Sequence, residues 1–362
     1  MQTVKSSTTL CHPLLAEIDS LYADLSEKKE QSRIVPVSYD ESLKGIVDIF
    51  HKETGVKRNF RYVQEDIEPL ELPDFPEKSV VVCFSGGKDS FSVARHYQEL
   101  KYDVHLYHLK GLNATYCGEY SEHIMAKKCA DYMGLPLTVE EVSYSGYHEW
   151  TEHPMKNMIL ASRALSWGIR NGISCKVAVG TFKTAFLQDN PFEVCGGDCV
   201  EMWKAYDKVI RRIVPKYRTL FPNENYQTAY VTLTDEPQAL PVLISCMTPN
   251  RFRKAFRERT VRKYGVDLLP FRCGCCWKDA VEYIWFTDRG YLQLNEPYYI
   301  HCLEVLGNTH KKETGEKLNS VEELWGKYFF SPMEKSILYK EIQNATIQSN
   351  GKIIRSNNTS EG

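Results

Sequence analysis

The stretch that decides the fold runs from residue 80 to residue 90 and reads Val-Val-Val-Cys-Phe-Ser-Gly-Gly-Lys-Asp-Ser. Its apolar first half predicts a buried strand, and a helix-like pattern follows its polar second half. The consecutive glycines Gly86 and Gly87 let the backbone turn sharply and bring N–H groups close to an anion, and the helix start adds the positive end of its dipole. We therefore predict a nucleotide phosphate loop between the strand and the helix.

The polar residues around the two glycines narrow the kind of loop. Ser85 and Ser90 offer hydroxyl donors, and Lys88 offers a positive charge. The spacing differs from Gly-x-x-x-x-Gly-Lys-Ser/Thr, which disfavours a Walker-type kinase or GTPase. An ordinary glycine-rich turn would explain the glycines but not the Ser, Lys, Asp and Ser around them, so we prefer the functional interpretation.

Short apolar segments alternate with helical patterns after this loop. Such alternation predicts an α/β fold with a doubly wound parallel sheet, in which ligands bind beyond the carboxyl ends of the strands. The first helix is expected to face the sheet through Phe91, Ala94, Tyr97 and Leu100. The predicted strands are 80–84, 104–109, 137–142 and 176–180, and the predicted helices are 89–100, 119–133 and 155–171.

The segments outside this alternation divide the chain further. An amphipathic helix is expected near residues 14–25, a Lys/Arg-rich helix that leads away from the sheet after Val200, and another helix over Thr248–Tyr264. The polar C-terminal stretch has few aromatic residues, which is typical of disorder. The predicted organisation is an N-terminal extension and linker 1–78, a core 79–285, a helical extension 286–342 and a disordered tail 343–362.

Composition sets limits on the class of protein. The 362 residues are 43% hydrophobic and 25% charged, as in ordinary soluble proteins, with no apolar stretch long enough to span a membrane and no secretory signal. We expect a cytoplasmic protein without a membrane partner. The net charge of -2 gives no global attraction to nucleic acid. The basic stretches Arg251–Lys263 and Lys204–Arg218 are interpreted as solvated helix faces, with RNA binding as the alternative.

The loop sequence Ser-Gly-Gly-x-Asp-Ser after a buried strand resembles the signature of the PP-loop ATP pyrophosphatases. Members of that superfamily cleave ATP to AMP and pyrophosphate while they activate an oxygen of their substrate. The resemblance implies the adenine nucleotide alpha hydrolase (HUP-like) version of the fold. It also implies adenylation chemistry.

Four further stretches, in order along residues 79–285, resemble motifs of the 7-cyano-7-deazaguanine synthase (QueC) family. Each is weak alone, and the resemblance depends on their order and spacing. Lys156 replaces the arginine of the family motif. The stretches are Tyr116-Cys117-Gly118-Glu119 with Glu122, then Pro154-Met155-Lys156-Asn157, then Gly180 with Asp189 and Asp198-Cys199, and finally Cys273-Gly274-Cys275-Cys276.

The resemblance implies a C–N bond-forming ligase that uses ATP and Mg²⁺. The family adenylates the carboxylate of 7-carboxy-7-deazaguanine, lets ammonia displace AMP to give an amide, and dehydrates the amide to a nitrile. Mg²⁺ offsets phosphate charge in such displacements. In this assignment Asp89 caps the helix or holds Mg²⁺, and Lys88, Asp89 and Lys156 are the catalytic candidates. The nucleotide would be held by Ser85, Gly86, Gly87, Lys88, Asp89, Ser90 and Gly180.

Three residues are candidates for contact with the deazapurine substrate. A guanine-like base presents donors that a carboxylate can accept in bidentate fashion, and Asp198 stands where the family places its base-reading acid. The alternative role for Asp198 is to cap the helix that carries Trp203. Asp189 is a weaker candidate by the same logic. Asn157, with Lys156, could meet phosphate or the substrate carboxylate, or could simply be an exposed helix start.

The cysteine cluster predicts zinc. Cys273, Cys275 and Cys276 are close enough to converge on one ion, and thiolates suit tetrahedral zinc. Adjacent cysteines bind one metal with difficulty, and the family's four-cysteine spacing is compressed here, so a fourth ligand would come from elsewhere. The candidates for it are Cys246, Cys195 and Cys199, with Cys246 preferred, and buried thiols are the alternative.

The sequence is also compatible with other functions. The chain is much longer than a QueC-like core, which suits a related ligase that joins a deazaguanine to a protein amine in antiviral defence, with the N-terminal extension as a partner-binding segment. A PP-loop tRNA thiolase could use Cys195 or Cys199, although the near-neutral charge argues against it. The lysine at position 156 gives slight support to a non-catalytic nucleotide-binding subunit. A homodimer is compatible with each.

Overall fold

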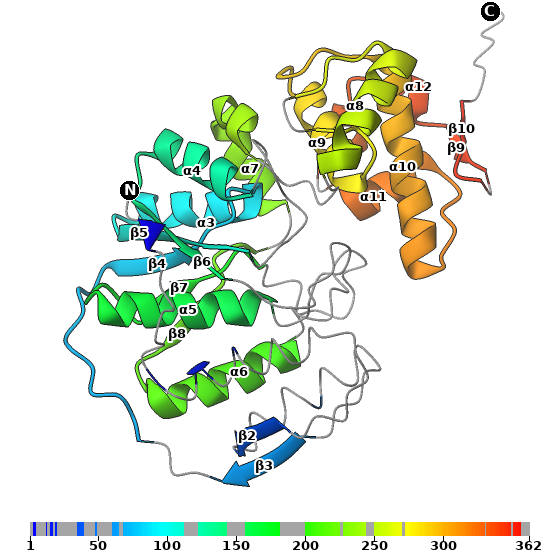
Figure 1. The fold of residues 1–362 in the computed structure, drawn as a ribbon. Coiled ribbons are helices and arrows are strands. Elements are labelled where there is room, and N and C mark those ends of the chain that lie inside the picture. The colour runs from blue at the N-terminus through cyan, green and yellow to red at the C-terminus, as the bar shows by residue number, and fades with distance from the viewer. Residues whose placement is uncertain are drawn as a thin grey trace, which may run out of the picture. The chain divides into compact units, whose positions relative to one another are not determined.

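A computed structural model gives the structure of the chain, which divides into two compact units, Met1–Ala229 and Tyr230–Gly362 (Figure 1). The structure describes most of the chain after residue 67 and short pieces before it. The described residues are 3–4, 12, 15–16, 19, 35–39, 48, 60–64, 68–111, 122–142, 156–181, 200–224, 227–243, 250–269, 272–329, 331–348 and 350–355.

The first unit is built on a parallel sheet whose strand order is β1-β6-β5-β4-β7-β8. The all-apolar centre of β4 explains its place in the middle, because every residue of that strand is buried. The chain runs from β4 to β5 and β6 on one side and then returns to β7 and β8 on the other. The strands are β1 (Thr3–Val4), β4 (Ser79–Cys83), β5 (Asp103–Lys110), β6 (Leu137–Glu141), β7 (Lys176–Ala178) and β8 (Arg218–Leu220).

Helices cover both faces of this sheet. The helices α3 (Lys88–Glu99) and α4 (Glu122–Met133) lie on one side, and α5 (Lys156–Arg170) and α6 (Val200–Ile213) lie on the other (Figure 1). The predicted α/β fold with a parallel, doubly wound sheet is therefore confirmed. The strand order reverses beside β4, which places the loop after β4 at the position where such sheets bind ligands.

Two details of the predicted packing are wrong. Helix α6 does not lead away from the sheet, because its apolar side packs into the same core as Val81 and Tyr107. Its stripe of Met202 and Tyr206 is fully buried there. Leu100 does not face the sheet, because α3 ends at Glu99 and the Leu100 side chain is 47% exposed.

The N-terminal extension contributes to the core of the first unit. Leu15 is fully buried in the cluster beneath α5 and α6, and Leu70 of the predicted linker packs against that cluster. The strands β2 (Val35–Tyr39) and β3 (Phe60–Gln64) form a separate parallel pair. Most of the helix predicted near residues 14–25 lies outside the described residues.

The second unit is mainly helical. In the part of the chain that the structure describes, every helix is too short or too polar to span a bilayer. The unit boundary lies inside the predicted core 79–285, so the parallel sheet and the cysteine segment belong to different units. The main helices are α7 (Thr228–Asp235), which spans that boundary, then α8 (Asn250–Tyr264), α9 (Trp277–Asp288), α10 (Glu296–Thr314), α11 (Val321–Tyr328) and α12 (Tyr339–Ile342), with short 3-10 turns at Pro237–Val242 and Met333–Lys335.

The C-terminal segment differs from the disorder that its composition predicts. Strands β9 (Thr346–Ile347) and β10 (Ile353–Ile354) pair as an antiparallel hairpin. Ile347 and Ile353 are buried, and Ile347 also donates its N–H to the carbonyl of Asn319 at 2.9 Å. The disorder prediction therefore does not hold for this hairpin.

Candidate functional site

The loop after β4 is the centre of the candidate site. Phe84 continues the strand by donating its N–H to the carbonyl of Tyr107 at 2.8 Å, and α3 then begins at Lys88. Gly87 is the N-cap, with an extended backbone and no side-chain capping bond. The first N–H groups of a helix have no partners within the helix, so the start of α3 presents donors and a positive dipole end at the carboxyl edge of the sheet.

Gly86 fixes the shape of the loop because it touches another helix. Its φ of +75° is a left-handed conformation that glycine adopts without strain. A Cβ at this position would lie 2.7 Å from the backbone N and Cα of Ala126 in α4. The position therefore requires glycine both for its dihedral angle and for the close approach of the two backbones.

Gly180 approaches the same loop from β7. A Cβ there would meet the Ser90 N atom at 3.3 Å, which is tighter than most real contacts, and the Asp89 Cβ at 3.4 Å, which is ordinary van der Waals contact. The structure thus places Gly180 beside the loop after β4. Sequence alone gives only their order along the chain.

Hydroxyl groups hold the loop in one conformation. Ser90 Oγ donates to the Gly87 carbonyl at 3.0 Å and accepts from the Ser85 N–H at 3.3 Å. Ser85 Oγ accepts from the Gly87 N–H at 3.3 Å and lies 3.3 Å from Ser90 Oγ. The two serines therefore hold the turn in one conformation. Because the turn is already ordered, it would lose less conformational entropy on binding an anion.

Lys88 and Asp89 form an ion pair at the first turn of α3. The Lys88 Nζ atom lies 2.6 Å from Asp89 Oδ1, and the two side chains are 4% and 31% exposed. The predicted capping role of Asp89 is wrong, because Gly87 occupies the N-cap position and Asp89 lies inside the first turn. Its carboxylate instead balances the lysine charge beside the helix N-terminus, where a negative group is favourable.

Two residues outside the predicted set also hold the loop, Asn223 and His108. Asn223, only 1% exposed, donates its side-chain N–H to the Asp89 carbonyl at 3.1 Å. His108 Nδ1 lies 2.8 Å from the Phe84 carbonyl, and burial lowers the pKa of this histidine. A carbonyl accepts only, so Nδ1 is the protonated nitrogen of the neutral ring. Neither residue belongs to a motif, and the sequence carries no signal that could have found them.

The other predicted site residues of the first unit divide into two groups. Lys156 and Asn157 are the first residues of α5, which follows β6 and therefore starts at the same edge of the parallel sheet as the loop after β4. Asp189 and Asp198 lie outside the described residues, as do Cys195, Cys199 and the motif residues 116–119.

The cysteine segment of the second unit is an ordered turn before α9. The Asp279 Oδ2 atom accepts N–H bonds from Cys273 at 3.1 Å and from Gly274 at 2.8 Å. Cys273 is buried, and Cys276 is the N-cap of α9, with its Sγ accepting from the Asp279 N–H. Cys275 is exposed, and its hydrogen bond with Cys273 lowers the pKa of the thiol, against the effect of burial.

The zinc prediction stays a prediction. Within the residues that the structure describes, no group of three metal-ligating side chains converges. The Cys273 thiol is buried, the Cys275 thiol is exposed, and the Cys276 thiol caps α9. Cys246, the preferred fourth ligand, lies outside the described residues. No chemical step is therefore assigned to zinc.

Comparison of the sequence with protein-family models and with curated proteins found no match in either set.

Proposed function

We propose that the chain is an ATP-dependent enzyme that adenylates a carboxylate and releases pyrophosphate. The observation that carries this proposal is the loop after β4, in which Gly86 is pressed against α4 while the start of α3 faces the carboxyl edge of the sheet. A tight, preorganised turn of backbone N–H groups beside a helix N-terminus is a favourable environment for phosphate. Its Ser-Gly-Gly-Lys-Asp-Ser sequence supports the PP-loop class rather than a Walker-type NTPase.

The chemistry explains why such a loop would be needed. A carboxylate is a poor electrophile because its leaving group would be oxide. When a carboxylate oxygen attacks the α-phosphorus of ATP, the bond between that phosphorus and the oxygen that links it to the β-phosphorus breaks. Pyrophosphate then leaves with that oxygen. The product is a mixed anhydride that an amine can attack. A loop that holds the β- and γ-phosphates stabilises the charge that develops on this leaving group.

Individual residues have roles in this proposal that their positions support. Gly86 would supply an N–H donor to the phosphates, while Gly87 and Ser90 would turn their donors to the phosphates from Ser85 Oγ and the Gly87 carbonyl. Lys88 would exchange part of its contact with Asp89 for a phosphate oxygen. Mg²⁺, which the reaction class requires, would offset phosphate charge, and Asp89 is the carboxylate at the loop that could bind it.

The substrate class is proposed from the QueC resemblance. A 7-carboxy-7-deazaguanine-like acid would meet Lys156 and Asn157 at the start of α5 through its carboxylate. Asp198 and Asp189 are the proposed contacts for its base edge. Ammonia is the proposed nucleophile, with an amide or a nitrile as product.

The test is incubation of the purified chain with ATP, Mg²⁺ and 7-carboxy-7-deazaguanine, with and without ammonium, followed by mass analysis of the nucleotides and bases. We expect AMP and pyrophosphate in stoichiometric amounts, and an amide or nitrile only with ammonium. Release of ADP and phosphate would contradict adenylation. AMP without any modified base, together with a mass increase on a protein added to the reaction, would replace ammonia by a protein amine as the nucleophile.

A further inference from the structure

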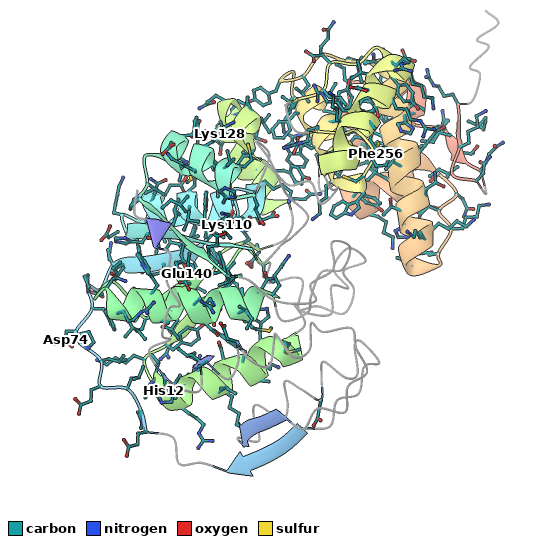
Figure 2. The ribbon with its side chains drawn as sticks, in the orientation of Figure 1. His12, Asp74, Lys110, Lys128, Glu140 and Phe256 are labelled. Carbon is teal, nitrogen blue, oxygen red and sulfur yellow. The ribbon has the colours of Figure 1, made fainter. Side chains whose placement is uncertain are left out.

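Helix α8 carries an exposed row of cations that the adenylation chemistry does not use. The helix contains seven lysine and arginine residues and one acidic residue, Glu258. Lys254, Arg259, Arg262 and Lys263 are exposed, while Thr260 faces the interior with 6% exposure. Phe256, labelled in Figure 2, marks the middle of this helix.

Arg257 of the same helix has a structural role, with which the exposed cations can be compared. Arg257 donates to the carbonyl oxygens of Leu268, Leu269 and Arg272, at 2.5 to 3.0 Å, and so fixes the segment that leads to the cysteine turn. The four exposed cations make no such bonds among the described residues, and none of them forms an ion pair there. Lys263 lies 4.6 Å from the Tyr264 ring centre.

The spacing of these cations concentrates positive charge. Lys254 and Arg262 share one row of the helix with Glu258 between them, and Arg259 and Lys263 share the neighbouring row. The rows extend over about 14 Å of helix length at 1.5 Å per residue. Four cations and one anion give this face a local charge of +3, whereas the whole chain carries -2. The separations are comparable to the Debye length at physiological salt, so the charges reinforce one another.

We propose that this face of α8, defined by Lys254, Arg259, Arg262 and Lys263, binds the phosphodiester backbone of a nucleic acid. Such a backbone offers regularly spaced negative charge and needs no apolar pocket. A protein partner would need a buried aromatic or apolar anchor at the centre of its interface. Among the side chains of α8 that the structure describes, the apolar ones on the exposed side are Ala255 and Val261, of which Val261 is 37% exposed. Backbone contacts alone give binding without base specificity.

The experiment measures binding of the full-length chain to three labelled probes of equal length: a single-stranded RNA, the same sequence as DNA, and the duplex DNA. Fluorescence anisotropy is recorded between 50 and 200 mM salt. Four phosphate contacts predict a slope of log affinity against log salt of about -3 for single strands, which is roughly a 50-fold loss of affinity over this range. The three probes distinguish RNA from DNA and single strands from a duplex.

The decisive variant replaces Lys254, Arg259, Arg262 and Lys263 by Gln. We expect it to lose most of the salt-dependent slope and at least about 50-fold in affinity at 50 mM salt. The double variant K254Q/R259Q keeps the cations of the last turn, which also stabilise the helix C-terminus, and should lose about half of the slope. The control replaces four other exposed lysines of the same unit, Lys312, Lys317, Lys335 and Lys340, by Gln.

Three results would overturn the proposal. The first is no binding of any probe at 50 mM salt. The second is an equal loss in the α8 variant and the control, which would mean that only the number of charges matters. The third is binding of a polyglutamate peptide with the same affinity and salt dependence, which would assign the face to acidic proteins. Circular dichroism of each variant is the folding control, and each should retain the helical content of the wild type.

Discussion

The ammonium nitrogen of Lys88 lies 2.6 Å from the carboxylate of Asp89 in the first turn of α3, with the lysine buried and the aspartate partly exposed. If this cation also meets the phosphates of ATP, Lys88→Met should weaken nucleotide binding roughly 10- to 100-fold, because a hydrogen bond to a charged group contributes about 1.5 to 3 kcal/mol. Calorimetric titration with a non-hydrolysable ATP analogue measures this. The control is Lys127→Met on α4, whose lysine is 47% exposed. Equal affinities of the two variants would contradict a phosphate-binding role for Lys88.

Gly86 should tolerate no side chain. The left-handed conformation alone costs about 1 to 2 kcal/mol for alanine, and overpacking against α4 adds about 1 to 3 kcal/mol. The matched control is Gly134→Ala, because Gly134 has a φ of +66° but no atom within 4 Å of its added Cβ. Urea unfolding should therefore show Gly86→Ala less stable than Gly134→Ala, and only the former should lose pyrophosphate release. Similar unfolding free energies would mean that the loop moves freely away from α4.

Arg163 holds two carboxylates in the interior of the first unit. It pairs with Glu140 of β6, which is labelled in Figure 2, and with Asp19 of the N-terminal extension. Tyr107 also donates to Glu140 at 2.5 Å, and burial raises the pKa of this tyrosine well above its usual value. We expect Arg163→Met to lower the free energy of unfolding by about 3 to 5 kcal/mol, because removing one partner leaves buried charge unpaired.

An exposed ion pair provides the comparison for Arg163. Lys127 and Asp131 lie 2.6 Å apart on the surface of α4, with side chains 47% and 65% exposed. Lys127→Met should change the unfolding free energy by less than about 1 kcal/mol. If Arg163→Met and Lys127→Met lowered the unfolding free energy equally, the buried pairs of Arg163 would contribute no more than the exposed pair.

Asp288 should make the stability of the second unit depend on pH. Burial raises its pKa from 3.8 to about 6, against the bonds that its Oδ1 accepts from the Tyr299 hydroxyl at 2.8 Å and the Ile337 N–H at 3.2 Å. Between these values the folded state keeps a proton that the unfolded state has released. The free energy of unfolding should therefore fall as pH rises from about 4 to about 6, by up to about 3 kcal/mol.

The substitution Asp288→Asn isolates this effect, because the amide oxygen can still accept both bonds while the titration is removed. Unfolding free energies at pH 4, 5, 6 and 7 should decline in the wild type and stay flatter in the variant over the same range. Parallel curves for the two proteins would place the origin of any pH dependence elsewhere.

The zinc content of the purified chain tests the zinc prediction directly. If Cys275 is a ligand, elemental analysis of the purified chain should find about one zinc ion per chain, and Cys275→Ser should remove most of it. Cys175→Ser in the first unit is the control, because a serine hydroxyl can keep the bond that Cys175 makes to the Lys216 carbonyl. Wild-type protein without zinc would leave the ordered turn anchored by Asp279 as the whole role of this segment.

The sequence predicts the fold best where a periodic pattern is long. The apolar run before Ser85 and the alternation that follows it locate β4, α3, β5, α4, β6 and α5 to within a few residues. The hairpin of β9 and β10 was missed because each strand has only two residues, too few to show a period. Helix α6 was predicted as amphipathic, but a stripe alone does not say which surface it covers.

The site could be predicted only where its residues are adjacent in sequence. The loop from Ser85 to Ser90 is such a run, whereas Asn223 reaches Asp89 from 134 residues away. Asp89 follows the pattern of a capping residue, yet the backbone places Gly87 at the cap. Contacts of this kind arise from how β4, β7 and α4 come together in space, which no single segment encodes.

The close approach of Gly86 to the backbone of Ala126 couples the loop after β4 to α4. Because backbone meets backbone at this contact, the turn cannot shift toward α4, and any displacement of α4 toward the sheet must displace the turn. Helix α4 follows directly on residues 112–121, where one of the four family-like stretches lies. A molecule that bound those residues and displaced α4 would therefore change the conformation of the loop without touching it.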